Sequence, residues 1–134
     1  MIGIVLVSHG KMADGLMDAM QMIAGEQEAV RAIGLHETED VDELMAKIQQ
    51  AVAQVDSGSG VLILVDLFGA SPFNASARLA LSHPEQSIEV VTGVNLAMLV
   101  ELVVSREGLS LIEAVDLVMQ VGPESMRKLS DLKV

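Results

Sequence analysis

The chain has 134 residues, of which 51% are hydrophobic and 20% charged, and a formal net charge of −11. This length and apolar content suit one globular domain with a substantial core, and the lack of cysteine excludes disulfides, zinc–thiolate sites and thiol nucleophiles. So acidic a chain, with two phenylalanines and no tryptophan or tyrosine, disfavours nucleic acid as a partner.

Four short runs rich in branched apolar residues predict β-strands at residues 2–7, 29–35, 60–67 and 87–93. The segments between them have helical periodicity. In the first, the expected apolar face comprises Leu16, Ala19, Met20 and Ile23. In the second, the stripe comprises Val41, Leu44, Met45, Ile48, Val52 and Val55.

Strands that alternate with helices predict a doubly wound α/β fold. We expect a mainly parallel four-stranded sheet of order 2-1-3-4, with helices on both faces in three layers. The first and third strands are the most continuously apolar, so they should be central.

Near the C-terminus, the segment SLIE at 110–113 is a capping-box signature and predicts the start of a helix that ends at Gly122-Pro123. Residues 123–134 fit a short helix, an arm or an extra antiparallel edge strand. There is no repeat or linker, so residues 1–134 are predicted to form a single domain.

The MIGIVLV opening is too short for a signal peptide and lacks a basic flank. The later apolar runs are shorter than the roughly 20 residues of a membrane span. These features predict a cytoplasmic protein.

Polar residues in glycine-rich turns end three of the predicted strands: SHG at 8–10, DLFGASPFN at 66–74 and TGVN at 92–95. In open parallel sheets, sites form outside the carboxyl ends of the strands, where the winding reverses. If the first and third strands are neighbours, His9 and Asp66 meet there.

A carboxylate beside an imidazole accepts a hydrogen bond from one ring nitrogen and leaves the lone pair of the other free. It also stabilises a positively charged ring, such as a phosphorylated one. We therefore interpret His9 as a phosphorylated nucleophile and Asp66 as the residue that orients it. The structural alternative is a histidine that only caps a turn.

A phosphate-binding loop is predicted next to this pair. Ser71-Pro72 has the pattern of a helix start, with Ser71 as the N-cap. Gly69, Ala70 and Ser71 would then present backbone N–H groups and a hydroxyl at the positive end of the helix dipole. Capping alone would also explain Ser71.

Gly10 and Asn95 are weaker candidates. Gly10 lacks a side chain and would let a partner protein approach the ring, and Asn95 is expected to cap a helix and line the cleft. Lys11 and Arg31 could bind phosphate, but a solvated side chain is the simpler interpretation of Lys11. The nine methionines are interpreted as core residues, and neither a metal nor a cofactor is expected.

Several segments resemble the EIIA component of the phosphoenolpyruvate:sugar phosphotransferase system (PTS) of the mannose/fructose/sorbose class. They are VSHG at 7–10, GEQEAV at 25–30, VDLFGASPFNASAR at 65–78 and VVTGVNLAMLVEL at 90–102. The resemblance spans nearly the whole chain. It implies that His9 matches the phosphorylated histidine, Asp66 its aspartate and Ser71 the serine of the phosphate-contacting loop.

The resemblance also implies partners. The phosphoryl group would come from HPr to Nε2 of His9, with Nδ1–H directed to the aspartate. It would pass to EIIB and through it to the EIIC/EIID membrane permease, at whose cytoplasmic side the protein would work. Because the chain ends soon after the EIIA unit, EIIB should be a separate polypeptide. A homodimer with an exchanged edge strand is implied, and residues 124–134 are the candidate arm.

Three alternatives stay open. The IIA-like subunit of dihydroxyacetone kinase uses the same histidine chemistry, although FGASPFN at 68–74 resembles the sugar branch more closely. A metal chelatase would need a second histidine across the cleft, and neither His36 nor His83 follows an inner strand. A non-catalytic binding module would need no covalent step.

Overall fold

The sheet consists of four strands, β1 (Gly3–His9), β2 (Val30–Leu35), β3 (Val61–Val65) and β4 (Ile88–Thr92). They are seen in a computed structural model that describes residues 1–132. All pairings are parallel and the order is β2-β1-β3-β4, which confirms the predicted topology. The two central strands, β1 and β3, are the continuously apolar ones, because both of their faces are covered.

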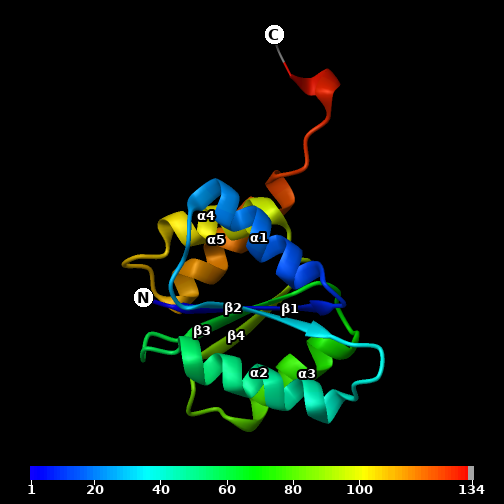
Figure 1. Ribbon diagram of the computed structural model, residues 1–134. Helices are drawn as coiled ribbons and strands as arrows, with labels where there is room; N and C mark the ends of the chain where they lie inside the picture. Colours follow the sequence, from blue (N-terminus) through cyan, green and yellow to red (C-terminus); the bar gives the residue numbers. More distant parts are fainter. Residues whose placement is uncertain (133–134) are drawn as a thin grey trace.

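In the described part of the chain, five α-helices complete a three-layer arrangement (Figure 1). One face carries α1 (Met12–Ala24), α4 (Leu96–Ser105) and α5 (Leu111–Glu124), and the other carries α2 (Val41–Val55) and α3 (Ser71–Ser82). Within residues 1–132, no helix has both the length and the apolar character needed to cross a membrane.

The alternation of side chains along β1 divides the core into two clusters. Ile4 and Leu6 pack with α1, α4 and α5, whereas Val5 and Val7 pack with α2 and α3. Both clusters therefore pack against β1, the strand that ends in His9.

The helical stripes agree with the expectation in α2 and differ in α1. The predicted stripe of α2 is buried or partly buried along its length. In α1, Ile23 is 62% exposed. Of the predicted face, Leu16 and Met20 do pack in the core, and Ala13, Met17 and Ala24 join them there.

The C-terminal helix is longer than predicted. Its capping box is formed between Ser110 and Glu113, but α5 continues through Gly122 and Pro123 to Glu124. Pro123 is tolerated because it lies in the last turn, where its missing N–H removes a single intrahelical bond.

Beyond α5 the chain leaves the body of the protein (Figure 1). Residues 125–132 contain a turn and a short 3₁₀-helix, η1 (Leu129–Asp131), and contribute no strand. Over residues 1–132, the antiparallel edge strand considered from the sequence is therefore not formed within this chain. Residues 133–134 of that segment lie outside the described part.

Candidate active site

The end of β1 is a tightly held turn. Gly10 adopts φ +53°, a left-handed conformation that suits glycine, and its N–H donates to the carbonyl oxygen of Leu35 at 2.9 Å. The buried Ser8 hydroxyl accepts the N–H of Ala13 at 2.7 Å and donates to the carbonyl oxygen of His9 at 3.0 Å. The turn is thus joined to β2 on one side and to the start of α1 on the other.

The structure brings His9 and Asp66 together across the two central strands. His9 Nδ1 lies 2.7 Å from Asp66 Oδ2, and the His9 backbone N–H donates to the same oxygen at 2.8 Å. The His9 side chain is 50% exposed and that of Asp66 is 10% exposed. With Nδ1–H as the donor, the Nε2 lone pair is free on the exposed ring.

Asp66 has opposing influences on its ionisation. Burial alone would raise the pKa of its carboxyl, but the hydrogen bonds from the N–H and the ring of His9 outweigh burial and lower that pKa below its ordinary value. The carboxyl is therefore ionised near neutral pH. Its other oxygen, Oδ1, is buried and has no hydrogen-bond partner among residues 1–132.

The start of α3 differs by one residue from the prediction. Ala70, with φ −90° and ψ 178°, is the N-cap, Ser71 is the first helical residue, and no side chain caps the helix. Ala70 takes this role because its carbonyl oxygen accepts the first-turn N–H, that of Asn74, at 2.9 Å. The Ser71 hydroxyl is therefore not engaged in capping, and Gly69 precedes it with φ +80°.

Asn95 caps α4 as expected, and its polar atoms are engaged within the fold. Its Oδ1 accepts the N–H of Met98 at 2.9 Å, and its Nδ2 donates to the carbonyl oxygen of Gly122 at 3.3 Å and to Ser125 Oγ at 3.2 Å. These contacts account for Asn95 without a ligand.

The remaining charged and histidine candidates are placed as follows. Lys11 is exposed at the N-cap of α1. Arg31 donates to the carbonyl oxygen of Val30 and to the side chain of Gln54. His36 is exposed beyond β2, and His83 contacts Glu85 at 3.2 Å. None of these contacts involves His9 or Asp66.

An apolar rim next to the pair was not predicted. It comprises Met12, Leu67 and Phe68, which are 47%, 59% and 73% exposed and lie within three residues of His9 or Asp66. The Phe68 ring is supported by Phe73, at 4.9 Å between ring centroids. The signal in the sequence was two large apolar residues directly after Asp66, in a loop where burial cannot explain them.

The fold and this pair define a doubly wound α/β protein that presents a half-exposed, carboxylate-bound imidazole at its topological switch point. A family model described as "PTS system fructose IIA component" matches residues 3–119. The chain belongs to this family, which confirms the resemblance drawn from its motifs.

Individual relatives agree with the family match. The chain is 38% identical over 129 residues to the mannose-specific EIIAB component of Escherichia coli, a match that covers 96% of this chain and 39% of that protein. It is 34% identical to the sorbose-specific EIIA component of Lacticaseibacillus casei, in a match that covers 96% of this chain and 91% of that protein. The crystal structure of EIIA from Streptococcus agalactiae superposes with a TM-score of 0.91 at 32% identity, over 98% and 100% of the two chains.

Proposed function

We propose that this protein is the EIIA phosphocarrier of a sugar phosphotransferase system, with residues 1–134 as its single EIIA domain. It accepts a phosphoryl group from phospho-HPr on His9 and passes it to an EIIB component. The observation that supports this best is the 2.7 Å contact between His9 Nδ1 and Asp66 on a half-exposed ring. The names of the relatives, which are components of sugar systems, favour this function over the dihydroxyacetone kinase, chelatase and binding-module alternatives.

The reaction requires little beyond orientation. Nε2 of neutral His9 attacks the phosphorus of phospho-HPr in line, a P–N bond forms, and the bond to HPr breaks with its electron pair returning to HPr. Asp66 stabilises the ring as it becomes positive. The N–H groups and hydroxyl of Gly69, Ala70 and Ser71 would bind the phosphoryl oxygens at the start of α3. Transfer to EIIB repeats these steps with His9 as the leaving group.

A protein donor fits the surroundings of the ring. The apolar rim of Met12, Leu67 and Phe68 offers contact area beside His9, and Gly10 carries no side chain to obstruct an approaching partner. Exposed apolar side chains of this kind are typical of protein contacts. Through EIIB, the protein would serve the EIIC/EIID permease at the cytoplasmic side of the membrane.

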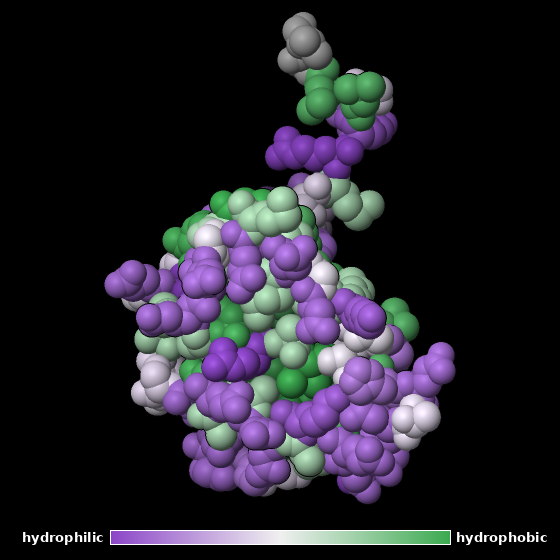
Figure 2. Space-filling model, viewed as in Figure 1, coloured by the Kyte–Doolittle hydropathy of each residue, from purple (hydrophilic) through white to green (hydrophobic). Residues whose placement is uncertain are grey.

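We also propose a homodimer formed through the C-terminal arm. Residues 125–132 stand away from the body (Figures 1 and 2), and their exposed side chains include three large apolar ones: Met126, Leu129 and Leu132. At the free edge of β4, a groove lies between β4 and α5, lined in part by Ile88, Leu111 and Ile112. The arm of a second copy could cover this edge.

The function is tested by incubating the protein with phosphoenolpyruvate, enzyme I and HPr. We expect a mass increase of one phosphoryl group that is acid-labile and alkali-stable, and that disappears in His9→Ala. The matched control is His36→Ala, an exposed histidine that follows the neighbouring strand. Absence of the modification from the wild type, or its persistence in a folded His9→Ala variant, would show that the proposal is wrong.

A further inference from the structure

A lysine on α2 holds the end of β2. Lys47 Nζ donates to the carbonyl oxygen of Gly34 at 3.0 Å and lies 2.9 Å from the Glu39 carboxylate. Glu39, whose side chain is 12% exposed, also accepts the backbone N–H of His36 at 2.8 Å. Lys47 thereby fastens both the last residues of β2 and the loop at 36–40 to α2.

The end of β2 holds the turn that carries His9 in place. Leu35 pairs with His9 in the sheet, and its carbonyl oxygen accepts the N–H of Gly10 at 2.9 Å. A Cβ on Gly34 would overlap the carbonyl oxygen of Gly10, so the two backbones are in direct contact. A displacement of Gly34 and Leu35 is therefore transmitted to Gly10 and to His9.

We propose that Lys47 is a positioning residue for His9. It touches neither His9 nor Asp66 and acts through the backbone of β2. The inference rests on the proposed phosphoryl transfer, in which rate depends on placement of the attacking nitrogen, and a misplacement of about 1 Å can cost about 100-fold. Without the ammonium group, the Gly34 carbonyl loses this donor and the Glu39 carboxylate loses its cation.

A second ion pair on α2 provides a matched control. Asp42 lies 3.6 Å from Arg78, with side chains that are 83% and 60% exposed, and this pair has no hydrogen bond to β2 or to the His9 turn. Asp42→Asn removes a charge from the same helix without loosening the end of β2. Exposed pairs of this kind contribute little to stability.

The experiment compares Lys47→Met, Lys47→Arg and Asp42→Asn with the wild type in single-turnover phosphorylation at increasing phospho-HPr. We expect the maximal rate of Lys47→Met to fall by about tenfold while the half-saturating HPr concentration changes less. Lys47→Arg should restore most of the rate, and Asp42→Asn should match the wild type. The ring nitrogen NMR signals of unphosphorylated His9 should shift in Lys47→Met alone.

The outcomes separate this proposal from the proposed function. If the wild type and Asp42→Asn are not phosphorylated, the function is wrong, and the His9 NMR signals alone decide whether Lys47 positions the ring. If all variants are phosphorylated at one rate with unchanged His9 signals, Lys47 has no positioning role. Should Lys47→Met fail to fold, Glu39→Gln tests the same support, with a smaller loss of rate expected and an unchanged rate contradicting the proposal.

Discussion

A single carboxylate oxygen sets both the backbone and the ring of His9. Asp66 Oδ2 accepts the His9 N–H at 2.8 Å and lies 2.7 Å from Nδ1. The first contact fixes where β1 ends relative to β3, and the second fixes which ring nitrogen remains free. In the proposed transfer, the negative charge of Asp66 would matter separately, because it would offset the positive charge that the ring gains.

Asp66→Asn separates these two contributions. An asparagine oxygen can still accept both hydrogen bonds, so the fold should persist, but the charge is lost. We expect the single-turnover rate of phosphorylation from phospho-HPr to fall by about 10- to 100-fold. Thermal unfolding followed by circular dichroism provides the check on folding. A folded variant that reacts at the wild-type rate would contradict the role given to Asp66.

At the scale of elements, helix starts depend on specific side chains. Asp40, Asn95 and Ser110 each accept a first-turn backbone N–H of the helix that follows. α1 is different, because its N-cap residue Lys11 provides no side-chain bond and Ser8 from β1 accepts the N–H of Ala13. The strand that carries His9 therefore also fixes the beginning of α1.

The capping box of α5 offers a direct stability test. Ser110→Ala removes the acceptor of the Glu113 N–H, which is bonded at 3.1 Å. We expect the free energy of unfolding to fall by about 1 kcal/mol, measured by urea denaturation. Ser82→Ala, at an exposed position in the last turn of α3, should change it by less than about 0.5 kcal/mol. Equal effects of the two substitutions would show that the box does not stabilise α5.

The four strands, the apolar stripe of α2 and the capping box of α5 were predictable from local sequence, and so was the meeting of His9 with Asp66. Apolar continuity indicates that β1 and β3 are central, and once they are neighbours the sheet's switch point brings together the residues that end them. The register at Ser71-Pro72 was not predictable, because that pattern fits a helix start at either of two residues. Ser8 and Lys47 were missed because each contacts the backbone of another segment, which leaves no residue pattern in the sequence.

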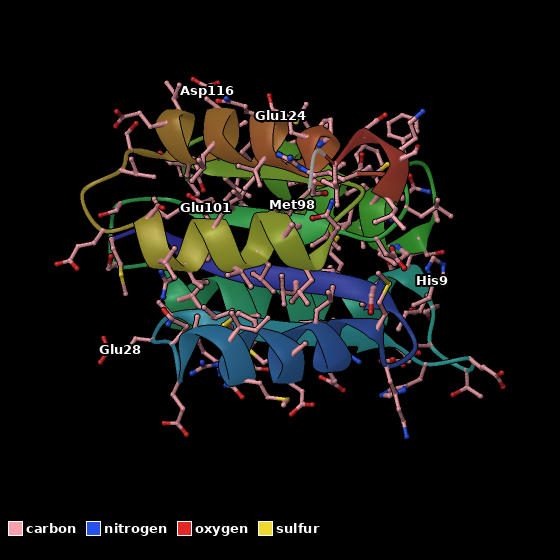
Figure 3. All side chains as sticks on the ribbon, turned by 90° about the horizontal axis from the view of Figure 1, so that it is seen from above. His9, Glu28, Met98, Glu101, Asp116 and Glu124 are labelled. Atoms are coloured by element: carbon pink, nitrogen blue, oxygen red, sulfur yellow. The ribbon has the colours of Figure 1, made fainter. Side chains whose placement is uncertain are left out.

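At the scale of the whole molecule, the two ends of the sheet differ in how their polar groups are engaged. His9 and Glu28 lie at opposite ends (Figure 3). Near Glu28, the buried Arg106 donates to the carbonyl oxygens of Ile2 and Ala29, both at 3.2 Å, and to that of Glu28. Burial lowers the pKa of this guanidinium, and the nearby Glu28 carboxylate opposes that shift. This end is bound together internally, whereas the proposed transfer site lies at the opposite end.

The apolar side chains of the arm, residues 125–132, are not buried by the chain that carries them. Leu129 is 81% exposed, and burying such a side chain against a partner is worth about 1.5–3 kcal/mol. Leu81, on α3, is 82% exposed and lies on the body rather than on the arm. The two leucines therefore have nearly the same exposure in different places, which makes them a matched pair.

If the arm joins two copies, Leu129→Glu should weaken self-association by at least about tenfold, because a carboxylate would replace an apolar contact. Leu81→Glu adds the same charge elsewhere and should leave the association unchanged. Sedimentation equilibrium of both variants and the wild type measures this directly. A monomeric wild type, or equal weakening by both substitutions, would mean that the arm does not form the interface. If only Leu129→Glu weakens self-association, the Leu129 side chain of the arm is buried by another copy.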